Sequence, residues 1–221
     1  NNKVNLIIKL KDTEKFYIEK VNIVGNSITS ERVIRNKLIA DEGDPYNEIL
    51  VNKSFNNIKS LGLFKSVRPE ILTNDNNKTK IINIKVEEKP TGEIFAGAGT
   101  GTSGSSLSVG ISENNYLGEG IKFGGSFVLT EKSLTGKLFI NEPNYKNSNR
   151  SFSRGIERKE DDNLDKYGYK TEKTGFNFGT SYEQYRDVYF SPTISNSYEK
   201  ITTNSKASAA KKKQDGNYLD L

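Results

Sequence analysis

The stretch EEKPTGEIFAGAGTGTSGSSLSVGISENNYLGEG, residues 87–120, separates two halves of the chain that differ in sequence character. Within it, residues 93–101 are predicted to form a strand, although Gly97, Gly99 and Gly101 occupy alternate positions near its end. A strand rich in glycine has few side chains to pack, so it is easily displaced from its neighbours. A glycine-rich linker or a barrel corner is the alternative interpretation of these residues.

The residues that follow predict a series of antiparallel strands. Apolar side chains occupy every second position, and the positions between them are mostly small and polar. Seven strands are predicted, at 93–101, 106–112, 121–130, 134–141, 150–158, 174–182 and 188–198. A soluble sandwich alternates in the same way. The small polar partners favour a transmembrane barrel with a wet lumen, as do short turns that hold a tyrosine opposite long polar loops predicted at 159–173 and 202–216.

One predicted strand, at 150–158, carries a charge in an apolar row. Arg154 is in phase with Phe152 and Ile156. A lipid-facing arginine costs roughly 2–4 kcal/mol at the bilayer midplane and much less near an interface. The sequence allows two solutions, a bulge that changes the phase of the strand or a position of Arg154 near the interface.

The residues before the stretch predict a small α+β domain at 15–90. The expected order is strand, helix, helix, strand, strand, with strands at 16–24, 64–72 and 80–86. Such helices can cover one face of a three-stranded sheet and leave an edge open. An open edge either recruits an extended peptide or is a charged, solvated rim.

Turn and capping residues set the predicted bounds of this domain. Gly25 and Asn26 form a turn after the first strand, and Thr29 is expected to cap the first helix. Asp44-Pro45 is expected to begin the second helix, and Gly62 to follow its end. A short apolar strand at 5–10 is expected to close a preceding unit, residues 1–14.

Composition excludes several classes of function. The 221 residues contain no methionine, cysteine or histidine, so we expect an internal piece of a longer protein without disulfides, a thiolate metal site or a Ser-His or Cys-His pair. Residues 1–90 hold 16 basic and 12 acidic side chains, and residues 91–221 hold 17 and 16. Because this net charge of +5 forms no basic stripe, nucleic acid is not an expected partner. No catalytic residue, cofactor or metal is expected, and the protein is not expected to be an enzyme.

Several short motifs, in order, resemble the outer-membrane protein assembly factor family, the barrel subunit of the bacterial β-barrel assembly machine. The motifs of a polypeptide-transport-associated (POTRA) domain are VNIVGNSIT at 21–29, GDPY at 43–46 and LGLFKSV at 61–67. The motifs of the beginning of the family's barrel are VEEKPTGEI at 86–94, GAGTGTSGSS at 97–106 and NYLGEG at 115–120.

This resemblance implies the end of a preceding POTRA unit at 1–14, a periplasmic POTRA domain at 15–90 and the N-terminal part of an outer-membrane barrel at 91–221. It also implies a weak seam where a client strand pairs with the first barrel strand. The seam strand comprises Glu93, Ile94, Phe95, Ala96, Gly97, Ala98, Gly99, Thr100 and Gly101. The other expected site residues are the periplasmic turn Asn115, Tyr116, Leu117, Gly118 and Gly120, and the POTRA turn Gly25 and Asn26.

The implied partners are unfolded outer-membrane protein clients, accessory assembly lipoproteins and outer-membrane lipids, and the implied function is assembly and insertion of those clients. Two alternatives remain. One is a protein secretion channel of the same superfamily, and the other is a periplasmic peptide-binding module joined to a soluble β-domain.

Overall fold

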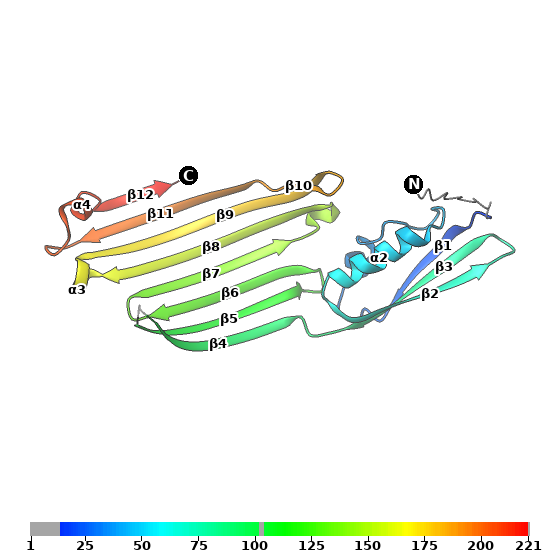
Figure 1. Ribbon diagram of the computed structural model, residues 1–221, viewed down its shortest axis with the longest axis horizontal. Helices are drawn as coiled ribbons and strands as arrows, with labels where there is room; N and C mark the ends of the chain where they lie inside the picture. The colour runs from blue at the N-terminus through cyan, green and yellow to red at the C-terminus, as the bar shows by residue number, and fades with distance from the viewer. Residues whose placement is uncertain (1–13, 102–103, 221) are drawn as a thin grey trace, which may run out of the picture. The chain divides into compact units, whose positions relative to one another are not determined.

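The computed structural model describes residues 14–101 and 104–220 (Figure 1). The chain divides into two compact units, Asn1–Asn26 with Lys37–Glu88, and Ser27–Asn36 with Lys89–Leu221. The strand predicted at 5–10 lies outside the described residues. None of the helices in the described ranges is long and apolar enough to cross a membrane.

The first unit is a three-stranded sheet with one helix. Strand β1 (Tyr17–Val24) runs parallel to β3 (Thr79–Glu88), which pairs on its other side with antiparallel β2 (Phe64–Asn74). Helix α2 (Glu48–Ser60) lies along the sheet (Figure 1). A register shift between residues 18 and 20 of β1 explains why apolar residues alternate imperfectly in its sequence.

The core of the first unit combines the two expected periodicities. It includes Ile18 and Val21 from β1, Val51, Phe55 and Ile58 from α2, Phe64 and Val67 from β2, and Ile82, Ile84 and Val86 from β3. The helix residues recur at the helical repeat and the β3 residues at every second position, so each element turns one apolar side inward. Burying each of these side chains contributes roughly 1.5–3 kcal/mol.

Two predicted helix starts are wrong. Asn47 caps α2, where its Oδ1 accepts from the N–H of Ile49 at 2.9 Å. Pro45 instead forms an isolated bridge with Tyr17, which places the Asp44-Pro45 pair before the helix. Helix α1 (Glu31–Arg35) follows Ser30 and not Thr29.

The end of α2 is as predicted. Leu61 is its C-cap, and the next residue, Gly62, has the positive φ of +71° that often ends a helix.

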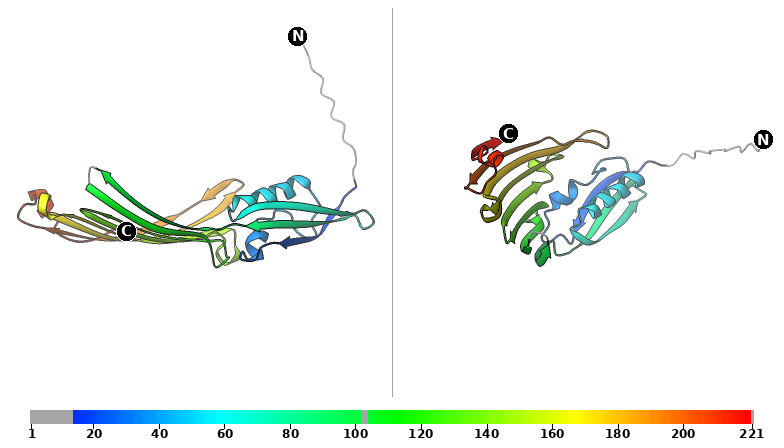
Figure 2. Two further views of the ribbon diagram at one scale, coloured as in Figure 1. Left: turned by 90° about the horizontal axis from the view of Figure 1, so that it is seen from below. Right: turned by 60° about the vertical axis from the view of Figure 1, so that its left-hand side comes forward.

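The second unit is a nine-stranded antiparallel sheet with the order β12-β11-β9-β8-β7-β6-β5-β4, in which β10 pairs only with β9 (Figure 1). Its strands are β4 (Gly92–Gly101), β5 (Gly104–Tyr116), β6 (Ile121–Thr130), β7 (Ser133–Glu142), β8 (Arg150–Asn163), β9 (Tyr169–Tyr185), β10 (Val188–Phe190), β11 (Thr193–Thr203) and β12 (Gly216–Asp220). Its short helices are η1 (Tyr145–Asn147), α3 (Leu164–Tyr167) and α4 (Ala209–Lys212), besides α1. The described part of this sheet is not closed, and Figure 2 shows that it curls.

The sheet has two more strands than predicted, and one predicted loop is absent. The expected strand at 188–198 is interrupted at Pro192, which has no N–H for a ladder, and so becomes β10 and β11. Part of the polar loop expected at 202–216 forms α4 and β12. The loop predicted at 159–173 is mostly strand, with only α3 and one glycine between β8 and β9. Of the two long loops predicted, only the connection between β11 and β12 is long in the structure.

Cross-strand register assigns the side chains of the sheet to two faces. We call one of them the apolar face; it carries Ile94, Ala96 and Ala98, Leu107, Val109 and Ile111, Phe123, Phe127 and Leu129, Leu134, Leu138 and Ile140, Phe152 and Ile156, Phe176 and Phe178, and Ile194 and Tyr198. Most of these large apolar side chains are exposed. The other face carries mostly Ser, Gly, Thr, Asn and charged residues, so the predicted alternation is confirmed.

Arg154 lies on the apolar face. Strand β8 pairs with β7 and β9 without a register shift, so no bulge changes its phase. Arg154 is opposite Ile140 on one side and Phe178 on the other. Of the two solutions that the sequence allowed, the bulge is excluded.

Candidate functional site: the edge strand and the first turn

Strand β4 contains the predicted seam residues and is an edge of the nine-stranded sheet. Among the described residues it pairs with β5 alone, from Gly92 opposite Glu113 to Gly101 opposite Gly104. All ten of its residues are exposed. Its outer row of backbone N–H and C=O groups can therefore accept another extended strand.

The side chains of β4 hold it weakly to β5. On the apolar face it presents Ile94 and two alanines, and Ile94 is 86% exposed. On the other face, Gly97 and Gly99 lie opposite Ser108 and Ser106, whose hydroxyls donate to the carbonyl oxygens of the two glycines at 3.3 and 3.4 Å. Alternate glycines thus leave the backbone ladder as the main connection along residues 97–101.

Phe95 is the exception in this row. Its ring covers Gly110 of β5, where an added Cβ would lie 2.2 Å from the ring. The ring fills the space left by the missing side chain, and Phe139 covers Gly124 in the same way two strands further along. Side-chain packing along β4 is therefore concentrated in its first half.

The predicted turn joins β5 to β6 and is built around a buried amide. Asn115 is only 7% exposed. Its Oδ1 accepts from the N–H of Gly120 at 2.8 Å, and its Nδ2 donates to Thr29 Oγ1 at 2.9 Å. Tyr116 packs at a tilt against Phe123, with ring centroids 5.8 Å apart. Asn115 therefore closes the turn and joins it to residues 27–36, which belong to the same unit.

The backbone of the turn makes a second connection to this segment. The carbonyl oxygen of Gly118 accepts from the N–H of Ser30 at 2.8 Å, and Arg32 forms an ion pair with Glu119. Gly118 has a φ of +73°, and a Cβ there would lie 2.1 Å from the carbonyl oxygen of Ile28. We call the contacts between residues 27–36 and 115–120 the latch.

The start of β4 is tied to the same turn. Glu113 Oε1 accepts from the hydroxyl of Thr91 and from the N–H of Asn115 at 2.7 Å. The carbonyl oxygen of Thr91 accepts from the N–H of Asn114 at 3.2 Å. The structure thus brings the seam strand and the turn motif together through residues that the sequence did not single out.

The remaining predicted residues have local settings. Gly25 has a φ of +94°, and a Cβ there would lie 2.0 Å from the carbonyl oxygen of Val86 in the first unit, so only glycine fits this turn with Asn26. Leu117 of the β5–β6 turn has a φ of +56° and is 78% exposed. The sequence did not identify Thr29 and Glu113 as site residues. Thr29 bonds to Asn115, which lies far along the chain, and Glu113 bonds to Thr91 and Asn115, a contact that no sequence pattern indicated.

Comparison with known proteins agrees with this architecture. The profile of the POTRA family, described as a surface antigen variable number repeat, matches residues 16–89. The outer membrane protein assembly factor BamA of Neorickettsia risticii is 34% identical over 119 residues, and that of Neisseria meningitidis serogroup B is 25% identical over 142 residues. Over these residues the chain is similar in sequence to the outer membrane protein assembly factors.

The matches to these relatives cover 53% and 63% of this chain but only 16% and 18% of the relatives' own length. Solved structures extend the likeness to the fold of nearly the whole chain. BamA from Haemophilus ducreyi lacking POTRA domains 1-3 superposes with a TM-score of 0.75 and 22% identity, over 93% of this chain and 42% of that one. CdiB from Acinetobacter baumannii gives a TM-score of 0.59 and 15% identity, over 86% and 39%. The fold is thus a POTRA domain followed by barrel-type antiparallel strands.

Proposed function

We propose that this chain is part of a factor that assembles and inserts β-barrel proteins in the bacterial outer membrane, with the POTRA domain in the periplasm. The observation that carries the proposal is β4, an exposed edge strand with few side-chain contacts in a sheet that presents an apolar face. The sequence similarity to outer membrane protein assembly factors supports it.

The mechanism is an exchange of backbone hydrogen bonds. A client strand pairs with the open edge of β4 and so satisfies its N–H and C=O groups before it meets the hydrocarbon, where unpaired groups cost several kcal/mol each. A client strand paired with residues 97–101 is easily released, because Gly97 and Gly99 contribute no side-chain packing. This process requires no catalytic group, so the function is not enzymatic.

The partners of such a factor are unfolded outer-membrane clients, accessory assembly lipoproteins and membrane lipids. Clients are recognised through their backbone, because the edge of β4 offers hydrogen bonds and almost no side-chain pocket. Among the described residues β2 of the first unit pairs with β3 alone, so its other edge is a second place where an extended peptide can add a strand.

Cysteine cross-linking tests the proposal, and these 221 residues contribute no background cysteine. One cysteine is placed at Ala98 of β4 and one in the last strand of the full-length protein. Cross-linking should abolish insertion of client barrels and leave the protein folded, as measured by its heat-modifiable migration. A matched pair in β6 and β7, at Phe127 and Gly136, which lie opposite each other, should leave insertion intact.

Full insertion activity after complete cross-linking at Ala98 would contradict strand templating. It would favour the second candidate, a secretion channel that uses the lumen. That candidate is supported by the small polar residues on the face opposite the apolar one.

A further inference from the structure

The apolar face is interrupted on β8 by arginine. Arg150, Phe152, Arg154 and Ile156 all lie on this face, and β8 has no register shift that would turn any of them away. We propose that Arg154, assisted by Arg150, binds the phosphate of an anionic phospholipid in the leaflet next to the β5–β6 turn. This inference rests on the proposed function, because it requires the apolar face to meet lipid.

The first argument is the direction of the Arg154 side chain. Its guanidinium carbon lies 5.7 Å from the ring centroid of Phe152, two residues nearer to the start of β8. Arg150, at that start, stacks its guanidinium on Tyr182 at 5.3 Å. Arg154 thus reaches along the strand toward the end of the apolar face where aromatic rings and a second guanidinium gather. Long cationic side chains reach toward the interface in this way.

The second argument is charge. Among the described residues, neither Arg150 nor Arg154 forms an ion pair, and Lys146 adds a third positive charge above the ring of Tyr145 at 5.5 Å. The ring of Tyr145 in turn packs at a tilt against Phe152, with centroids 5.1 Å apart. Two carboxylates lie near this group: Glu142, opposite Phe152 on β7, and Glu119, which lines a cavity with Lys146 and is already paired with Arg32. A cluster with excess positive charge and aromatic rings at a membrane boundary suits an anionic headgroup, and the guanidinium can bind phosphate with two hydrogen bonds.

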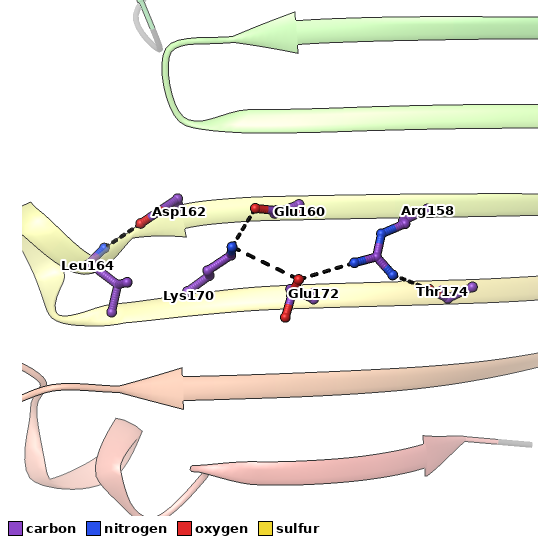
Figure 3. A network of polar contacts seen from close by, with 7 residues as sticks. All are labelled: Arg158, Glu160, Asp162, Leu164, Lys170, Glu172 and Thr174. Carbon is purple, nitrogen blue, oxygen red and sulfur yellow. Dashed lines mark hydrogen bonds and ion pairs between the residues drawn. The ribbon is translucent and has the colours of Figure 1, made fainter.

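At the other end of the same face, protein groups balance the charge of an arginine. Arg158 donates to Glu172 at 3.1 Å and to Thr174 at 3.2 Å, and Lys170 pairs with Glu160 at 2.5 Å (Figure 3). These residues form a charged ladder between β8 and β9 that ends the apolar face. Protein groups therefore neutralise the charges at this end, whereas Arg154 depends on a ligand from outside the sheet.

Distance sets where the phosphate binds. Arg154 is four residues from Arg150, about 13 Å along the strand and about 10 Å in depth at the tilt of barrel strands. Its side chain covers part of this depth by leaning toward Phe152. The phosphate must move toward the middle of the bilayer over the remaining depth, so the lipid layer is thinned locally beside β8.

The test uses the full-length protein in nanodiscs of phosphatidylcholine with or without phosphatidylglycerol, with lipids that stay bound counted by native mass spectrometry. Wild type should retain phosphatidylglycerol in preference to phosphatidylcholine. Arg154→Leu should retain about tenfold less phosphatidylglycerol, since a charge-assisted bidentate contact is lost, and Arg154→Lys should fall between them. Arg158→Leu is the matched control on the same strand and face and should behave as wild type, because the partners of Arg158 are protein groups.

Three results would overturn the inference: equal retention by wild type and Arg154→Leu, equal losses in Arg154→Leu and Arg158→Leu, or no preference for the anionic lipid in wild type. Heat-modifiable migration verifies that each variant is folded, and Arg154→Lys preserves the test if Arg154→Leu does not fold. If the wild-type protein fails to enter the bilayer at all, the proposed function itself is wrong. If it enters and the arginine is irrelevant, only the lipid site is wrong.

Discussion

Replacing Gly118 with alanine tests whether the latch is a built contact. At a φ of +73°, the backbone alone costs an L-residue roughly 1–2 kcal/mol. The added Cβ would also lie 2.1 Å from the carbonyl oxygen of Ile28, and real Cβ contacts are essentially never shorter than 3.0 Å. Because backbone atoms form both sides of this contact, the turn and residues 27–36 must move apart.

That movement breaks the bond from the N–H of Ser30 to Gly118 and strains the bond from Asn115 to Thr29. Each hydrogen bond contributes roughly 0.5–1.5 kcal/mol net. Together with the backbone term, local opening should become easier by about 2–5 kcal/mol. Because 1.4 kcal/mol is a factor of ten, the Ser30 amide should exchange with deuterium at least about 30-fold faster.

Gly62→Ala is the matched control. Gly62 has a nearly identical φ of +71°, but an added Cβ meets nothing within 4 Å. It should therefore carry the backbone cost alone, roughly 1–2 kcal/mol, and leave the exchange of Ser30 unchanged. The measurement is hydrogen exchange followed by mass spectrometry on the full-length protein. Unchanged protection of Ser30 in Gly118→Ala would refute the latch.

Asn115→Ala should weaken the same contact by about 1–3 kcal/mol, because it removes the bond to Thr29 and leaves the buried N–H of Gly120 without its acceptor; hydrogen exchange at residues 27–36 measures this, and unaltered exchange would contradict the assignment. Ile58→Ala should lower the free energy of unfolding of a 14–90 fragment by about 2–5 kcal/mol in urea, whereas Ile49→Ala, 77% exposed on the same helix, should change it by less than about 0.5 kcal/mol. The hydrogen bond from Lys65 and the charge of Lys65 lower the pKa of Glu87 in the folded state. The ionised carboxylate should therefore stabilise the folded protein above its ordinary pKa of 4.5, and this stabilisation should be lost as the pH falls through the lowered pKa. The stability difference between wild type and Glu87→Gln in urea should therefore shrink in acid, and a constant difference would show that the Lys65 contact is not formed.

The parts of the fold that the sequence predicts well are those in which one short period decides the structure. Alternation located β4 to β9 and assigned their faces, and the helical repeat located α2. Capping was less predictable, because Asp44 and Asn47 are both good N-caps and only the bridge from Pro45 to Tyr17 decides between them. Local signals compete at such positions, and a contact distant in sequence settles the outcome.

The charged residues between 158 and 173 show a different limit. Their composition is that of a solvated loop, yet they form the ends of β8 and β9. The ladder of opposite charges, with Arg158 on Glu172 and Lys170 on Glu160, stabilises the strands where no apolar side chain does. Cross-strand pairs of this kind depend on register, which a single strand's sequence does not reveal.

The candidate site is a strand that side-chain contacts hold at one end. Near its start, β4 follows Thr91, whose hydroxyl and carbonyl groups bind the β5–β6 turn through Glu113 and Asn114. Phe95 adds packing, and beyond it alternate glycines leave mainly the backbone ladder. Each residue from Gly97 onward therefore loses few side-chain contacts when its backbone hydrogen bonds are exchanged for those of another strand. The start of β4 keeps its position during this exchange. A template needs both properties, because an incoming strand must find an accessible edge and a fixed register.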